Sequence, residues 1–177
     1  DIWFKFYKIL LENMCWNLFH IRLVRINPDD KGGLEYALQL KEQYGAEVTV
    51  ITMGPPQAEA VLREAFAMGA DRAILLTSRK FAGADTLATS NALAGALRVL
   101  DYDLILAGRQ AIDGDTAQVG PQIAEHLGIA QVSYLEDLEF DGKKTFRIKK
   151  QLEDGYQIVE VESPCLLTCL YRRGNRA

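Results

Sequence analysis

The stretch YDLILAGRQAIDGDTAQVGPQIAEHLG, residues 102–128, decides the fold. It opens with an apolar run at residues 104–107, which is typical of a strand covered on both faces in a parallel sheet. Gly108 ends that run, and a polar loop follows. The next segment has helical periodicity and ends at Gly128; its apolar positions are Val119, Ile123, Ala124 and Leu127. The stretch therefore predicts a strand–loop–helix unit of an α/β protein.

The loop ahead of this helix has the composition of a phosphate site. The first N–H groups of a helix lack partners within the helix and lie at the positive end of its dipole, so they favour a bound phosphate. Gly114 and Gly120 allow close approach of the backbone. The alternative is an ordinary turn at residues 113–114, with Asp115 or Thr116 capping the helix. The loop matches neither the Walker A nor the G-x-G-x-x-G pattern, so spacing alone favours the turn and cap.

The same alternation of strand and helix precedes this unit, and it predicts the fold class. Strands are expected at residues 21–26, 47–53 and 73–77, and helices at residues 28–44, 57–68 and 86–100. After Gly128 only strands follow, at residues 131–140, 145–152, 157–162 and 166–170. We expect an α/β fold with a doubly wound, mostly parallel sheet, Rossmann-like and of the adenine-nucleotide-binding type, and an antiparallel C-terminal extension.

Ligands of such sheets bind beyond the carboxyl ends of the strands. Three loops are expected there, at residues 53–55, 79–86 and 108–120. Asp85 is also the expected N-cap of its helix, and without other evidence that simpler role is the favoured one.

Composition narrows the class of protein. The chain has 177 residues, 49% of them hydrophobic and 25% charged, which fits one domain. The net charge of −4 argues against nucleic acid as a partner. Three cysteines without metal-ligand spacing indicate free thiols and a cytoplasmic location. We find no catalytic or metal-binding constellation.

Residues 1–20 stand apart from this pattern. They are rich in aromatic residues but too charged and too short to form a transmembrane segment. Two interpretations stay open: an amphipathic helix that docks on a partner or membrane surface, or a terminus without a native role. The predicted organisation is a divergent segment at 1–20, one nucleotide- or flavin-binding α/β domain at 21–171 and a tail at 172–177.

Several motifs resemble one family in order. INPDD at residues 26–30, VITMGPPQ at 50–57, FAGADTLATS at 81–90 and GRQAIDGDTAQVGP at 108–121 are similar to the beta subunit of electron transfer flavoproteins. The resemblance runs from about residue 26 to residue 168 and does not extend to residues 1–20, where that family has a buried strand. FAGADTLATS resembles the flavin-bifurcating and nitrogen-fixation-linked branch, in which this subunit holds a second FAD in place of AMP.

The resemblance implies a set of cofactor-binding residues: Asn27, Pro28, Asp29, Asp30, Met53, Gly54, Asp85, Thr86, Thr89, Gly108, Arg109, Gln110, Ala111, Ile112, Asp113, Gly114, Asp115, Thr116, Ala117, Gln118 and Val119. It also implies FAD, alternatively AMP, as cofactor and an electron transfer flavoprotein alpha subunit as partner. The electrons would come from NADH and pass to a ferredoxin or flavodoxin and to an acyl-CoA dehydrogenase or quinone reductase. The protein would then be an electron carrier rather than a stand-alone enzyme.

Two other classes stay open. One is a noncatalytic adenine-nucleotide-binding module similar to the universal stress proteins, although their glycine-rich phosphate pattern is absent. The other is an inactive fragment of the flavoprotein family. Co-purification separates them, since a yellow heterodimer, a colourless ATP-binding homodimer and an empty monomer are their respective signatures.

Overall fold

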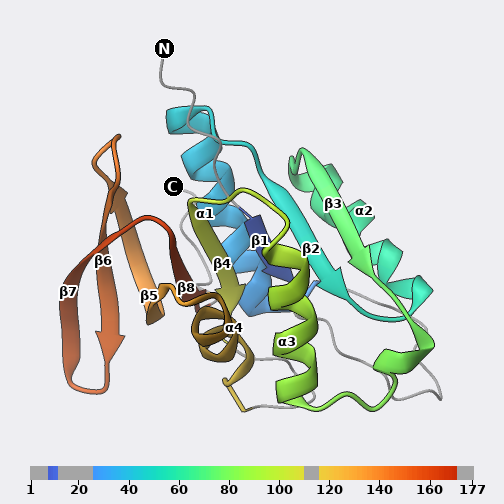
Figure 1. Cartoon of the computed structure of the whole chain (residues 1–177). Coiled ribbons are helices and arrows are strands. Elements are labelled where there is room, and N and C mark those ends of the chain that lie inside the picture. The colour runs from blue at the N-terminus through green and yellow to red at the C-terminus, as the bar shows by residue number, and fades with distance from the viewer. Residues whose placement is uncertain (1–7, 12–25, 110–115, 171–177) are drawn as a thin grey trace.

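One mixed sheet runs through the computed structural model, which describes residues 8–11, 26–109 and 116–170 (Figure 1). Within these residues eight strands follow the order β3-β2-β1-β4-β8-β5-β6-β7. The first six in that order pair in parallel, and β6 and β7 are antiparallel to their neighbours. The strands are β1 (Lys8–Leu11), β2 (Thr49–Met53), β3 (Arg72–Leu76), β4 (Leu104–Gly108), β5 (Ala130–Phe140), β6 (Thr145–Leu152), β7 (Gly155–Glu162) and β8 (Cys165–Cys169).

The helices begin and end at residues suited to those positions. They are α1 (Pro28–Tyr44), α2 (Glu59–Met68), α3 (Thr86–Leu97) and α4 (Val119–Leu127), with short 3₁₀ turns at Pro56–Ala58 and Arg79–Phe81. Asn27 caps α1 by accepting the Asp29 N–H, and Gly45 ends that helix in the left-handed conformation. No helix among these residues is long and apolar enough to cross a membrane.

The core has two parts, one on each face of the sheet. Along β4, Leu104 and Leu106 belong to the cluster that contains the buried residues of α1 and α2. The intervening Ile105 and Ala107 belong to the cluster that contains those of α3 and α4. Because successive side chains of a strand point to opposite faces, both faces are covered by helices. The predicted doubly wound α/β fold with an antiparallel extension is confirmed.

The position of β1 corrects the interpretation of the N-terminal segment. Lys8–Leu11 lies in the middle of the sheet, where Ile9 pairs with Val50 of β2 on one side and with Leu106 of β4 on the other (Figure 1). The interpretation of residues 1–20 as an amphipathic helix is therefore wrong for these four residues, which form a strand. The physical reason is backbone pairing: a strand between β2 and β4 satisfies hydrogen-bonding groups that both would otherwise leave open. The strand expected at residues 21–26 lies outside the described residues except for Ile26, which is not in a strand.

The C-terminal strands extend the sheet in an order that the sequence does not reveal. β8 inserts between β4 and β5, although β6 and β7 precede it in the chain. The first part of β5 pairs in parallel with β8, and its last part pairs antiparallel with β6. The register shifts between Val132 and Leu135, where Tyr134 has a φ of 63°. This irregularity lets the long strand β5 pair with β8 along its first part and with β6 along its last part.

Aromatic contacts fasten the antiparallel extension to α1. The rings of Phe140 and Phe146 stack at a centroid distance of 4.6 Å, and Tyr44 of α1 packs edge-on against Phe140 at 5.2 Å. The Tyr36 hydroxyl donates a hydrogen bond to the carbonyl oxygen of Glu136. The extension is thus held by the main core as well as by its own pairing.

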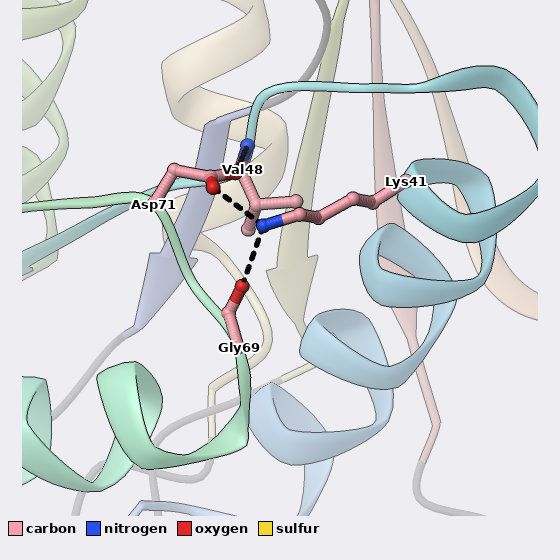
Figure 2. Close-up of polar contacts among 4 residues, drawn as sticks. All are labelled: Lys41, Val48, Gly69 and Asp71. Carbon is pink, nitrogen blue, oxygen red and sulfur yellow. Dashed lines mark hydrogen bonds and ion pairs between the residues drawn. The ribbon is translucent and has the colours of Figure 1, made fainter.

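A polar cluster fixes the opposite end of α1 (Figure 2). The Lys41 ammonium donates to the carbonyl oxygen of Gly69 at 2.9 Å and to the carboxylate of Asp71. The same carboxylate accepts the Val48 N–H at 2.9 Å. These contacts join the last turn of α1 to the residues that precede β2 and β3, at the amino end of the sheet.

Candidate functional site

The carboxyl end of β4 meets the first turn of α1. The Asp30 side chain is fully buried, and its Oδ1 accepts the Gly108 N–H at 2.9 Å. A Cβ on residue 108 would lie 2.5 Å from that oxygen and 2.9 Å from the Asp30 backbone nitrogen. Gly108 is therefore required for this close approach of helix and strand.

Arg109 continues this contact on the solvent side. Its N–H donates to the carbonyl oxygen of Cys169 at 3.0 Å, which extends the pairing of β4 with β8. Its guanidinium Nε lies 3.4 Å from Asp29 Oδ2. The Asp29 N–H donates to Asn27 Oδ1 at 3.1 Å. The start of α1 and the end of β4 thus form one bonded unit that contains Asn27, Asp29, Asp30, Gly108 and Arg109.

The starts of α3 and α4 form a second unit. The Thr86 hydroxyl donates to Gln118 Oε1 at 3.3 Å. Asp85 caps α3, since its Oδ1 accepts the Ala88 N–H at 2.8 Å, and this expected role is confirmed. The Thr89 hydroxyl donates to the Asp85 carbonyl oxygen at 2.7 Å, and its side chain is buried. Of these two threonine hydroxyl groups, that of Thr86 contacts the start of α4 and that of Thr89 stays within the start of α3.

The start of α4 differs from the simple capping alternative. The N-cap is Gln118, without a side-chain capping bond, so the expectation that Thr116 might cap this helix is wrong. Ala117 has a φ of 53°, a conformation that L-residues other than glycine, asparagine and aspartate seldom adopt. A Cβ on Gly120 would meet Thr168 Cγ2 at 2.8 Å, so the glycine lets α4 lie close to β8. The predicted site residues Gln110, Ala111, Ile112, Asp113, Gly114 and Asp115 lie outside the described residues.

At the end of β2, the hydrogen bond described at the carboxyl edge of the sheet comes from the backbone and not from a side chain. Met53 is 2% exposed and packs in the cluster that holds α3 and α4. The Gly54 N–H donates to the Leu76 carbonyl oxygen at 3.0 Å, which aligns the ends of β2 and β3. The ends of β2 and β4 are separated by β1 in the sheet, and Met53 shares a hydrophobic cluster with Val119.

Two residues of β8 contact the candidate site, and the sequence analysis did not predict them as site residues. Cys169 provides the carbonyl oxygen for Arg109, and Thr168 is the neighbour of Gly120. The sequence carried no signal for them, because their role depends on the insertion of β8 beside β4.

The two described cysteines are buried free thiols. Burial raises the pKa of the Cys165 thiol to about 12. Burial also raises the pKa of the Cys169 thiol, and the nearby carboxyl groups of Asp30 and Asp29 add to that effect. A thiol that stays protonated is neither nucleophilic nor a metal ligand. Among the described residues no group of three or more His, Cys, Asp or Glu side chains is placed to hold a metal ion.

Comparison of the amino-acid sequence with known proteins assigns the chain to a family. The family model of the electron transfer flavoprotein domain matches residues 22–173. The chain belongs to the electron transfer flavoprotein family. It is 65% identical over 145 residues to the electron transfer flavoprotein subunit beta of Clostridium acetobutylicum, covering 82% of this chain and 56% of the relative.

Other relatives of this electron transfer flavoprotein chain have more specific names. It is 57% identical over 147 residues to the caffeyl-CoA reductase-Etf complex subunit CarD of Acetobacterium woodii, covering 82% of this chain and 56% of the relative. It is 49% identical over 153 residues to protein FixA of Azorhizobium caulinodans, covering 82% and 54%. The chain spans about half the length of the curated relatives that it matches. The resemblance inferred from the sequence motifs is confirmed at the level of the beta-subunit family.

Proposed function

We propose that this chain binds an adenine nucleotide, FAD or alternatively AMP, at the carboxyl edge of its sheet, and that it works as the beta subunit of an electron transfer flavoprotein. One observation carries the proposal. The first turns of α1, α3 and α4 all lie at this edge, where α1 is bonded to the end of β4 and α3 to the start of α4. These contacts flank residues 110–115 of the family motif on both sides.

The donors at this edge suit a nucleotide phosphate. Helix starts present N–H groups at the positive end of the helix dipole, and α4 has neither a side-chain cap nor an acidic side chain in its first turn, whereas α3 is capped by Asp85. Arg109 adds a guanidinium whose side chain is 37% exposed, and Thr86 and Gln118 add a hydroxyl and an amide. In this proposal Arg109 and residues 110–119 bind the phosphates, and the ends of α1 and β2 orient the adenosine part. The bound flavin would supply the electron-transfer chemistry.

FAD is the cofactor that we favour over AMP. FAD carries a second phosphate and a flavin ring beyond the adenosine, so it needs donors further along the edge. The Thr86–Gln118 pair, with the exposed Arg79 and Lys80 nearby in the chain, would provide them. AMP needs none of these groups. The similarity to CarD and FixA also supports the bifurcating branch, in which NADH would reduce this flavin.

The proposed partners follow from the same similarity. The alpha subunit of an electron transfer flavoprotein would bind this chain and carry a further FAD. One electron acceptor would be an acyl-CoA dehydrogenase or a quinone reductase, and the other a ferredoxin or flavodoxin. Two relatives are named as parts of caffeyl-CoA and acryloyl-CoA reductase systems, which favours the acyl-CoA branch. We also propose a cytoplasmic location, because the described cysteines are free thiols.

The test is a cofactor count on the assembled heterodimer. The full chain is co-expressed with an alpha subunit from a related flavoprotein, and the purified complex is denatured and analysed by chromatography. Two FAD molecules per heterodimer are expected. One FAD plus one AMP would refute the FAD assignment, and loss of all nucleotide from this chain would refute the function.

A matched pair of variants tests the role of Thr86 in this count. Thr86→Val removes the hydroxyl that reaches Gln118, and it should lower FAD retention. Thr145→Val makes the same change on β6 in the antiparallel extension and should leave retention unchanged. Equal retention by both variants would show that Thr86 has only a structural part.

A further inference from the structure

The Arg109 guanidinium forms an ion pair with Asp29. Its Nε lies 3.4 Å from Asp29 Oδ2, and the Asp29 side chain is only 15% exposed. Asp30, the next residue of α1, is fully buried beside Gly108. Asp29 is therefore the carboxyl group that pairs with the guanidinium, whereas the Asp30 carboxyl accepts the Gly108 N–H.

The backbone holds this ion pair in place. Gly108 donates its N–H to Asp30, and Arg109 donates its own N–H to Cys169, so the base of the arginine side chain is fixed. Asp29 is fixed in turn by the first turn of α1 and by the Asn27 cap. The Arg109 side chain as a whole is 37% exposed, although its Nε is buried, so the outer part of the side chain can turn towards solvent. A change of partner for Arg109 thus requires side-chain rotation and no movement of the strand or helix.

We propose that Asp29 is a counter-ion that competes with the ligand phosphate for Arg109 and thereby limits the affinity of this site for anionic nucleotides. The inference rests on the proposed nucleotide function and deepens it. Asp29 would act through Arg109 and is therefore a positioning residue. It would offset the positive charge of Arg109 and make release of the anionic cofactor easier than Arg109 alone would allow.

The size of the effect follows from the charges. Asp29→Asn keeps the size of the side chain and removes one negative charge near the phosphate. With a water-like dielectric constant, removal of one like charge near the phosphate should raise the affinity for AMP by about three- to tenfold at low salt. Screening by salt should shrink the gain at about 0.5 M ionic strength.

The experiment measures binding of AMP and of adenosine to the full 177-residue chain by calorimetry. Asp29→Asn should raise the AMP affinity relative to the adenosine affinity, because adenosine carries no phosphate. Glu35→Gln removes the same charge from an exposed position further along α1 and should change neither affinity. In the Arg109→Gln background, Asp29→Asn should gain much less for AMP, since the competition is for the arginine.

The outcomes separate the two claims. If the unaltered chain binds neither AMP nor adenosine, the proposed function fails and the inference with it. If AMP binds but its affinity relative to adenosine is the same in Asp29→Asn, the inference alone is overturned. A gain that persists at high salt or in the Arg109→Gln background would likewise overturn it, because a structural change and not charge competition would then be responsible.

Discussion

Replacement of Gly108 by alanine tests whether the junction of α1 and β4 holds the site together. The added Cβ would lie 2.5 Å from Asp30 Oδ1, 2.9 Å from the Asp30 nitrogen and 3.1 Å from its Cγ. Two of these atoms belong to a buried side chain and one to the backbone, so little can move aside. Relief of the overlap requires a shift of the first turn of α1 and weakens the 2.9 Å hydrogen bond from Gly108 to Asp30.

The expected cost combines two effects. Overpacking of a tight interior costs about 1–3 kcal/mol. Weakening of a buried hydrogen bond to a carboxyl group adds about 1 kcal/mol or more. We therefore expect Gly108→Ala to lower the free energy of unfolding by about 2–4 kcal/mol.

The assay is urea denaturation with Gly33→Ala as the matched control. Gly33 lies within α1, where an added Cβ would make only ordinary contacts, the nearest at 3.6 Å to Cys169 Sγ. Gly33→Ala should therefore raise stability by about 0.5–1 kcal/mol through helix propensity. A Gly108→Ala chain as stable as the unaltered one, with the same denaturant slope, would refute the reasoning about this junction.

Three further changes test other parts of the description. Asp85→Ala removes the acceptor of the Ala88 N–H and should cost about 1 kcal/mol in urea denaturation; no loss would mean that the cap is dispensable. For Asp71, burial tends to raise the pKa, but the hydrogen bonds from Lys41 and from a backbone N–H, with the Lys41 charge, lower it below 3.8. Because the folded pKa is depressed, the stabilisation is complete above the unfolded value and is lost as the pH falls through the folded pKa. Asp71→Asn should therefore be destabilising near neutral pH and should approach the stability of the unaltered chain as the pH falls below the unfolded value. A difference in stability that is independent of pH would contradict this. Burial raises the pKa of Cys165 from 9.0 to about 12, so this thiol should react with a thiol reagent at pH 8 about a thousandfold more slowly than in the unfolded chain. Peptide mapping by mass spectrometry measures the rate. Rapid labelling of the native chain would show that the thiol is not buried.

Local sequence signals predicted the individual elements well. The cap at Asp85, the start of α1 after Asn27 and the stops at Gly45 and Gly128 all lie where the residue types indicated. These features depend on a few neighbouring residues and their backbone preferences, which a sequence shows directly. The predicted helix ends were less accurate. The helix α3 was expected to reach residue 100 but ends at Leu97, and no glycine follows Leu97 to mark that end in the sequence.

The pairing of distant segments was not available from the sequence. Lys8–Leu11 lies in an aromatic, charged stretch without strand alternation, yet it becomes a central strand because β2 and β4 both need a backbone partner. β8 lies beside β4, and this places Cys169 and Thr168 behind the candidate site. Such contacts join residues far apart in the chain, so no local pattern records them.

The candidate site shows the same division. The doubly wound α/β class and the loops at the carboxyl edge could be predicted from the sequence, because hydrophobic periodicity and glycine positions are local properties. The contacts between those loops came from the folded chain: Asp30 with the Gly108 backbone, Asp29 with Arg109 and Thr86 with Gln118. The physical reason is that hydrogen bonds and ion pairs require atoms within a few ångströms, and that proximity is set by how the strands order themselves in the sheet.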